Sequence, residues 1–95
     1  MMYTWAGVLI VHDQFNIGES ATATCTSDTP ATRIEWIRNG VVFASVVSTQ
    51  EIVLSVSQVT DNIHGQVYVC RVTRNGGMVA TQNFTVQVNG KKLIS

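Results

Sequence analysis

Apolar and polar residues alternate with a period of two along most of this chain, which is the pattern of half-buried β-strands. In the clearest segment, residues 19–26, the apolar side chains of Ala21, Ala23 and Cys25 point one way and the intervening threonines point the other. The alternation predicts strands over residues 8–11, 19–26, 33–38, 41–47, 51–57, 66–74 and 79–88. No segment shows a convincing helical period, so the pattern predicts an all-β protein.

Turn residues separate these predicted strands. Asn39-Gly40 predicts a tight hairpin, because both residue types tolerate positive φ, and the Asn-Gly-Gly sequence at 75–77 predicts another. The Ser-Asp-Thr-Pro cluster at 27–30 predicts a turn, and residues 60–65 form the corner before the next strand. Short strands at this spacing are typical of a β-sandwich.

The length and the charge content limit what the chain can be. Ninety-five residues are enough for one domain. Only 13% of the residues are charged and the net charge is zero, so we expect no nucleic-acid partner. The longest apolar run, 41–47, is far short of the roughly 20 residues that cross a bilayer, so we expect no membrane contact by this domain. The ends, at 1–2 and 91–95, read as residues added for expression, which leaves a core of about 8–88.

Two cysteines and two histidines are the candidates for site chemistry. Cys25 and Cys70 lack the spacing of a metal site, so they form either one disulfide or two buried free thiols. A disulfide would close a long loop, contribute about 4 kcal/mol in the chain-entropy model and imply an oxidising compartment. His12-Asp13 and His64 come without a nucleophile motif or a phosphate-binding loop, so we expect surface or corner histidines, no metal, no cofactor and no enzyme activity.

The order Cys25, Trp36, Tyr68-x-Cys70, with Leu54-x-Val56-x-x-Val59 ahead of the corner, resembles the immunoglobulin superfamily over nearly the whole chain. This resemblance implies an immunoglobulin-like antiparallel β-sandwich of about 7–8 strands. Cys25 of strand B would pair with Cys70 of strand F between the sheets. Trp36 of strand C would pack on the disulfide, and Tyr68 and Leu54 would complete the core signature.

Departures from the family pattern narrow the resemblance. The interval between the cysteines suits a compact I-like or C2-like set better than antibody variable domains, and the Phe-Gly-x-Gly bulge is absent. The corner is lengthened at His64 and Gly65, and no arginine lies between 41 and 57 to bridge its aspartate, so we expect no buried Arg–Asp bridge there. The chain is similar to ectodomain modules of animal cell-surface receptors, among them receptor tyrosine kinases and adhesion molecules of sponges.

The resemblance also places the candidate sites. Immunoglobulin domains often meet partners through the outward face of strands G, F, C and C′, where we expect a contact patch. Its candidate residues are Ile37, Val69 and Arg71, with Phe43 and Val47 flanking them and Met78 at the nearby hairpin. The end loops at 28–32 and 74–78 are a second candidate. Asn83-Phe84-Thr85 is the only glycosylation sequon, and Asn83 is expected to point outward.

These observations favour an extracellular protein–protein recognition module in a single-pass receptor or adhesion molecule. The expected partner is a protein ligand or a like immunoglobulin domain, with homophilic pairing as one mode. Two alternatives stay open: a spacer unit in a tandem array, and an immune-type domain that binds through its end loops.

Overall fold

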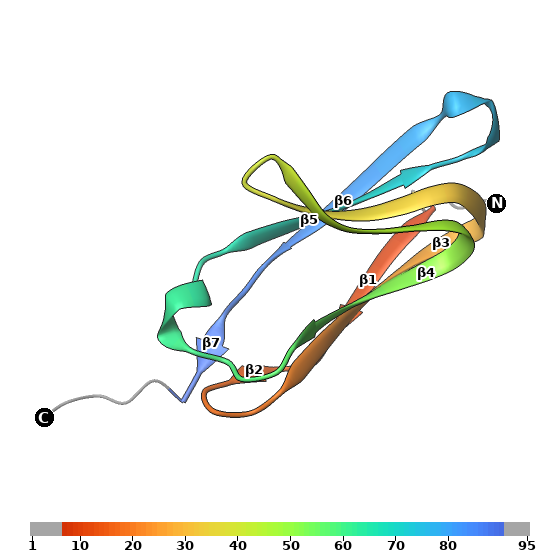
Figure 1. Cartoon of the computed structure of the whole chain (residues 1–95). Helices are drawn as coiled ribbons and strands as arrows, with labels where there is room; N and C mark the ends of the chain where they lie inside the picture. The colour runs from red at the N-terminus through yellow and green to blue at the C-terminus, as the bar shows by residue number, and fades with distance from the viewer. Residues whose placement is uncertain (1–6, 91–95) are drawn as a thin grey trace, which may run out of the picture.

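The computed structural model describes residues 7–90, apart from the side chain of residue 48, and these residues form an all-β fold (Figure 1). The strands are β1 (Val8–His12), β2 (Phe15–Asn16), β3 (Ala21–Arg38), β4 (Val41–Val56), β5 (Val67–Thr73), β6 (Val79–Thr85) and β7 (Val88–Asn89). Two short 3-10 turns, Asp61–Ile63 and Asn75–Gly77, complete the elements. The predicted fold class is confirmed. The prediction that residues 1–2 and 91–95 were added for expression concerns residues outside the described part of the chain.

The two layers of the sandwich share strands β3 and β4. In the first layer, β1 pairs with residues 23–27 of β3, and residues 21–26 of β3 pair with 51–56 of β4. The second layer pairs 33–38 of β3 with 41–47 of β4 on one side and with β5 on the other, and β6 lies beside β5. Both long strands bend from one layer to the other at the same end of the molecule (Figure 1).

The turn predicted at 27–30 is wrong, because the chain bends there without leaving the strand. The ladder of β3 and β4 shifts register between Thr26 and Ala31. At the bend the Ser27 hydroxyl donates to the Thr29 carbonyl at 2.6 Å, and Pro30 has no N–H to offer a ladder. Strands that switch layers through such irregularities form the corners of sandwiches. The separate strands predicted at 41–47 and 51–57 likewise form one strand, β4.

The last predicted strand, 79–88, is interrupted after Thr85. The N–H of Val86 donates to the Gln66 carbonyl at 2.8 Å, and the chain then continues as β7, which runs parallel to β2. Strand β2 was not predicted, and its Phe15 is almost fully buried. The hairpin at Asn39-Gly40 forms as predicted, with φ of 53° and 76°.

The core lies between the layers around the predicted disulfide, which is confirmed. Cys25 of the first layer and Cys70 of the second have Cα atoms 6.5 Å apart. Trp36 is fully buried, and Tyr68 and Leu54 are also in the core. The Tyr68 ring stacks on Phe84 with centroids 5.7 Å apart, and Trp36 meets both rings edge-on. No helix in the described part of the chain is long and apolar enough to cross a membrane.

Candidate functional site

The candidate site is the outward side of the second layer, which we call the GFCC′ face. Strand register places its side chains in rows across the sheet. One row joins Glu35, Arg71 and Thr81, and the next joins Ile37, Val69 and Asn83. The face comprises Arg33, Glu35, Ile37, Val42, Ser45, Val47, Val69, Arg71, Thr73, Val79, Thr81 and Asn83.

Glu35 is the buried charge of this face. It points outward, as alternation predicts, yet its side chain is only 8% exposed because two arginines cover it. Arg71 donates from Nε to Oε1 at 2.8 Å, and Arg33 places Nη1 4.0 Å from Oε2. Removing a carboxylate from water is unfavourable unless a partner compensates it, and here the Arg71 contact does so.

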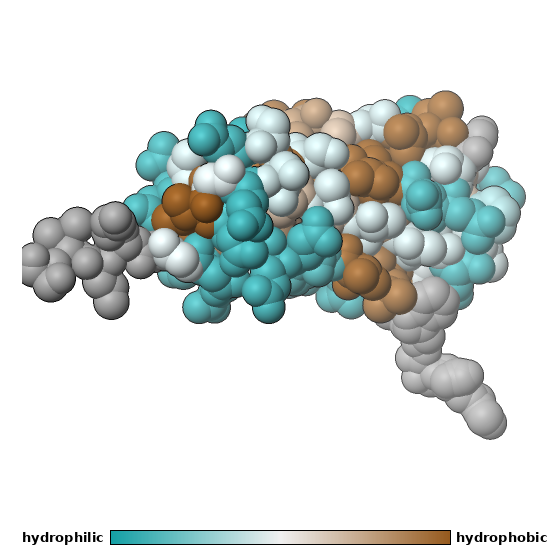
Figure 2. All heavy atoms as spheres, turned by 90° about the horizontal axis from the view of Figure 1, so that it is seen from below, coloured by the Kyte–Doolittle hydropathy of each residue, from teal (hydrophilic) through white to brown (hydrophobic). Residues whose placement is uncertain are grey.

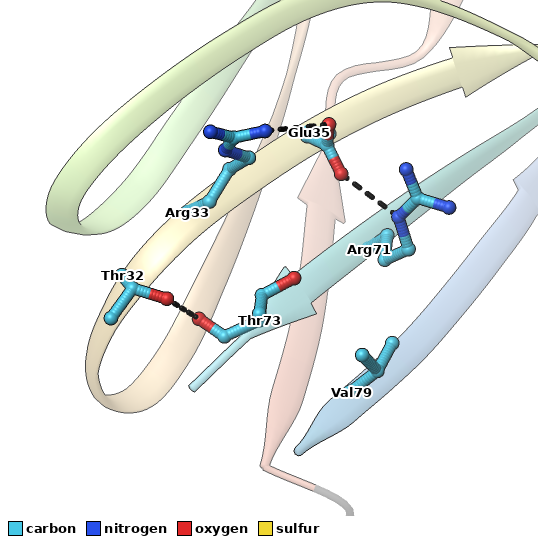
Figure 3. A pocket seen from close by; sticks show the side chains of 6 residues that line it. All are labelled: Thr32, Arg33, Glu35, Arg71, Thr73 and Val79. Atoms are coloured by element: carbon cyan, nitrogen blue, oxygen red, sulfur yellow. Dashed lines mark hydrogen bonds and ion pairs between the residues drawn. The ribbon is translucent and has the colours of Figure 1, made fainter. Parts of the chain in front are cut away.

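A hollow of about 440 Å³ opens beside this ion pair (Figure 3). Its lining comes from β3, β5 and β6: Thr32, Arg33, Glu35, Arg71, Thr73 and Val79. The rim is held in place across the strands, because the Thr32 hydroxyl donates to the Thr73 carbonyl at 2.9 Å. Sequence reasoning missed the hollow, since it depends on the register that sets Glu35 opposite Arg71.

The structure brings most of the predicted interface residues together. Ile37 and Val69 lie directly opposite each other and are half-buried, and Arg71 occupies the next row. Val47 is exposed beside Arg33. Met78 follows the turn that joins β5 to β6 and is 68% exposed.

Phe43 does not share the GFCC′ face. Its ring packs against the core residue Tyr68, with centroids 5.7 Å apart, and the Arg38 guanidinium lies 5.3 Å from the ring centroid. The irregular register of β3 and β4 between Trp36 and Ile37 turns this side chain toward the open edge of the core. Simple alternation counted from the Asn39-Gly40 hairpin could not predict this change in the direction of the Phe43 side chain.

Asn83 lies on the GFCC′ face, directly opposite Val69. It is exposed, as the sequon requires. A glycan on Asn83 and a protein in contact with Val69 would therefore compete for the same space. The sequence predicted the glycosylation site and the contact residue Val69 separately, and only the register of β5 and β6 shows that they are neighbours.

The end loops are tied to each other. Arg74 donates from Nη2 to the Asp28 carboxylate and to the Gly7 carbonyl, each at 2.9 Å. This bridge joins both loop segments that were candidates for binding, 28–32 and 74–78, to the start of β1. No sequence signal marked it, because the contact spans 46 residues.

Both histidines have structural contacts. His12 stacks on Phe84 with centroids 4.7 Å apart, and the Nδ1 atom of His64 accepts from the Val88 N–H at 3.0 Å. Asp13 accepts from the Thr22 backbone at 2.8 Å. Within residues 7–90, no three His, Cys, Asp or Glu side chains gather as a group that could hold a metal ion.

The first layer also exposes apolar side chains on its outer side. Leu9, Val11 and Val53 stand beside the outward threonines of β3. The outward threonines Thr24 and Thr26 separate the apolar residues of β1 from Val53 of β4. Figure 2 shows hydrophobic patches separated by polar surface on the side that it displays. Exposed apolar residues between polar ones are normal on proteins, so this layer supplies the control positions for the GFCC′ face.

Comparison with known families agrees with this architecture. The model of the immunoglobulin domain matches residues 13–82, which run from the end of β1 into β6 and include both cysteines, Trp36 and Tyr68. A comparison with curated proteins found no significant match. The family match covers most of the chain, and the chain belongs to the immunoglobulin domain family.

Proposed function

We propose that this chain is an extracellular protein–protein recognition module of a cell-surface receptor or adhesion molecule, and that it binds through the GFCC′ face. The observation that carries the proposal is the pairing of Ile37 with Val69 beside Arg71, whose side chain is 40% exposed. Interface centres combine large apolar groups with arginine, and this face offers that combination on rigid, paired strands.

Family membership supports the general part of the proposal. Immunoglobulin domains are generally non-enzymatic and commonly bind proteins, including other immunoglobulin domains. A disulfide-closed domain of this family indicates an extracellular location. The match is to the family as a whole and does not single out receptors of sponges.

The alternatives receive less support from the contacts. Binding through the end loops would use segments that the Arg74–Asp28 bridge already engages. A spacer has no need of an arginine and an apolar pair displayed side by side on one sheet face.

The test is a selection of binding peptides from a random display library against the wild-type domain. The selected peptides should lose binding to Ile37→Glu and keep it to Val53→Glu, which places the same charge on the outer side of the first layer. Peptides that bind both variants equally would contradict the proposal, as would peptides that only Val53→Glu rejects.

Homophilic pairing through the same face is a second mode, favoured by the apolar row and the zero net charge of the chain. A symmetric contact sets the same patch against itself, however, and each face carries two arginines and one glutamate. Like charges therefore meet, and we expect weak association that strengthens with salt. Sedimentation velocity over a hundredfold concentration range should show a dimer that Ile37→Glu abolishes; a monomer at every concentration would remove this mode.

A further inference from the structure

We infer that the hollow beside Arg71 anchors an acidic side chain, aspartate or glutamate, of the partner protein. This inference rests on the proposed function, because it names the chemistry that the GFCC′ face recognises. The hollow is lined by two arginines, two threonines and Val79 beside a buried carboxylate (Figure 3). The Ile37–Val69 pair is not part of the lining, but it lies in the row next to Glu35 and Arg71.

Glu35 holds Arg71 in position but engages only part of its guanidinium group. It donates to Glu35 through Nε, and within the described residues no hydrogen bond joins its two Nη groups to an acceptor. Glu35 holds the guanidinium in place through this 2.8 Å contact, and Arg71 is one of the residues that line the hollow. A fixed guanidinium favours a carboxylate, which it can bind with two parallel hydrogen bonds.

The charge of the hollow selects a ligand with one negative charge. Arg33 and Arg71 contribute two positive charges and Glu35 one negative charge, which leaves one positive charge to be balanced. A carboxylate balances it. A phosphate group, with its charge near two, would leave about one negative charge unbalanced beside the Glu35 carboxylate.

The occupant is a side chain of a protein rather than a free acid because apolar residues lie close to the hollow. Val79 lines it, and the Ile37–Val69 pair lies in the row next to Glu35 and Arg71. A partner that inserts a glutamate here lies over Ile37 and Val69, which provide the area that a single ion pair lacks. Exposed ion pairs contribute little alone, but a pair that an interface shields from water contributes more.

The experiment follows the arginine side-chain N–H resonances of the labelled domain by NMR. The probes are acetyl-Gly-Glu-Gly-amide, the same peptide with Gln in place of Glu, and inorganic phosphate. The Glu peptide should shift the Arg71 Nε–H resonance saturably, and the Gln peptide and phosphate should not. Followed through the Arg33 Nε–H resonance, Arg71→Gln should weaken binding at least about tenfold, and Arg71→Lys should weaken it less. Arg38→Gln, which removes an arginine placed over Phe43, should leave it unchanged.

Other results overturn the inference. These are equal shifts with the Gln peptide, tighter binding of phosphate, equal responses at Arg38, or no response at Arg71 in a folded domain. If selected peptides bind the GFCC′ face but the Glu peptide does not shift the Arg71 resonance, the inference about the hollow is wrong and the proposed function stands. If the selected peptides avoid the face, the proposed function fails as well.

Discussion

Replacing Gly7 by alanine tests whether Arg74 holds the end of the sandwich together. Gly7 has φ of 90°, and a Cβ built there would overlap the Arg74 guanidinium. The guanidinium is the far end of a flexible side chain, so it can move away. If it moves, its hydrogen bonds to the Gly7 carbonyl and the Asp28 carboxylate are lost.

The expected destabilisation has two parts. Alanine at this φ costs about 1–2 kcal/mol in backbone strain. The Arg74 contacts are partly shielded, with side-chain exposures of 23% for Arg74 and 35% for Asp28, and their loss costs about 1–2 kcal/mol more. Gly18→Ala is the matched control, because Gly18 has φ of 85° and open space around its Cβ position, so it carries only the strain.

Urea unfolding followed by tryptophan fluorescence measures the difference. Gly7→Ala should lower the free energy of unfolding by about 1–2 kcal/mol more than Gly18→Ala, which corresponds to a further drop in Tm of about 4–16 °C. In an Arg74→Ala background the excess should vanish. Equal destabilisation by the two alanines, or an excess that survives without Arg74, would refute the reasoning.

Three further results are expected. Reducing the disulfide should lower the free energy of unfolding by about 4 kcal/mol, and the unreduced protein should resist alkylation by intact mass; ready alkylation would contradict the assignment. Protein secreted from eukaryotic cells should carry a glycan on Asn83 that blocks the selected peptides until an endoglycosidase removes it, while Asn83→Gln binds throughout; unchanged binding by the glycosylated form would contradict the overlap. Glu35→Gln should destabilise the domain by about 1–2 kcal/mol, whereas the exposed Glu51→Gln should change stability by less than about 0.5 kcal/mol; similar values would mean that the arginine pair is unimportant.

Local patterns predicted the parts of this fold that local physics decides. Alternation identified most of the strand segments, although not β2 or the continuity of β3 and β4, and the Asn39-Gly40 pair predicted the hairpin. Both signals depend on residues near in sequence. Resemblance predicted the disulfide and the place of Trp36. The prediction of a turn at 27–30 was wrong, because Ser and Pro occur both in chain reversals and in bends within a strand. The sequence does not say whether a strand continues into the other layer.

The site depended more on register than on composition. Ile37 and Arg71 were placed on one face by alternation, but the burial of Glu35 requires that it stand opposite Arg71. The closeness of Asn83 to Val69 has the same origin, because a shift of one residue between β5 and β6 would separate them. Phe43 was misplaced because the register of its strand is irregular.

Mapping one selected peptide on the labelled domain by backbone amide chemical shifts is the most direct test of the GFCC′ face as the binding surface. Binding there should shift residues of β5, β6 and 33–37 of β3, with Ile37, Val69 and Arg71 among the most affected, and leave β1 and Val53 unchanged. Shifts confined to the first layer, or to the turn at Asn75–Gly77, would contradict it.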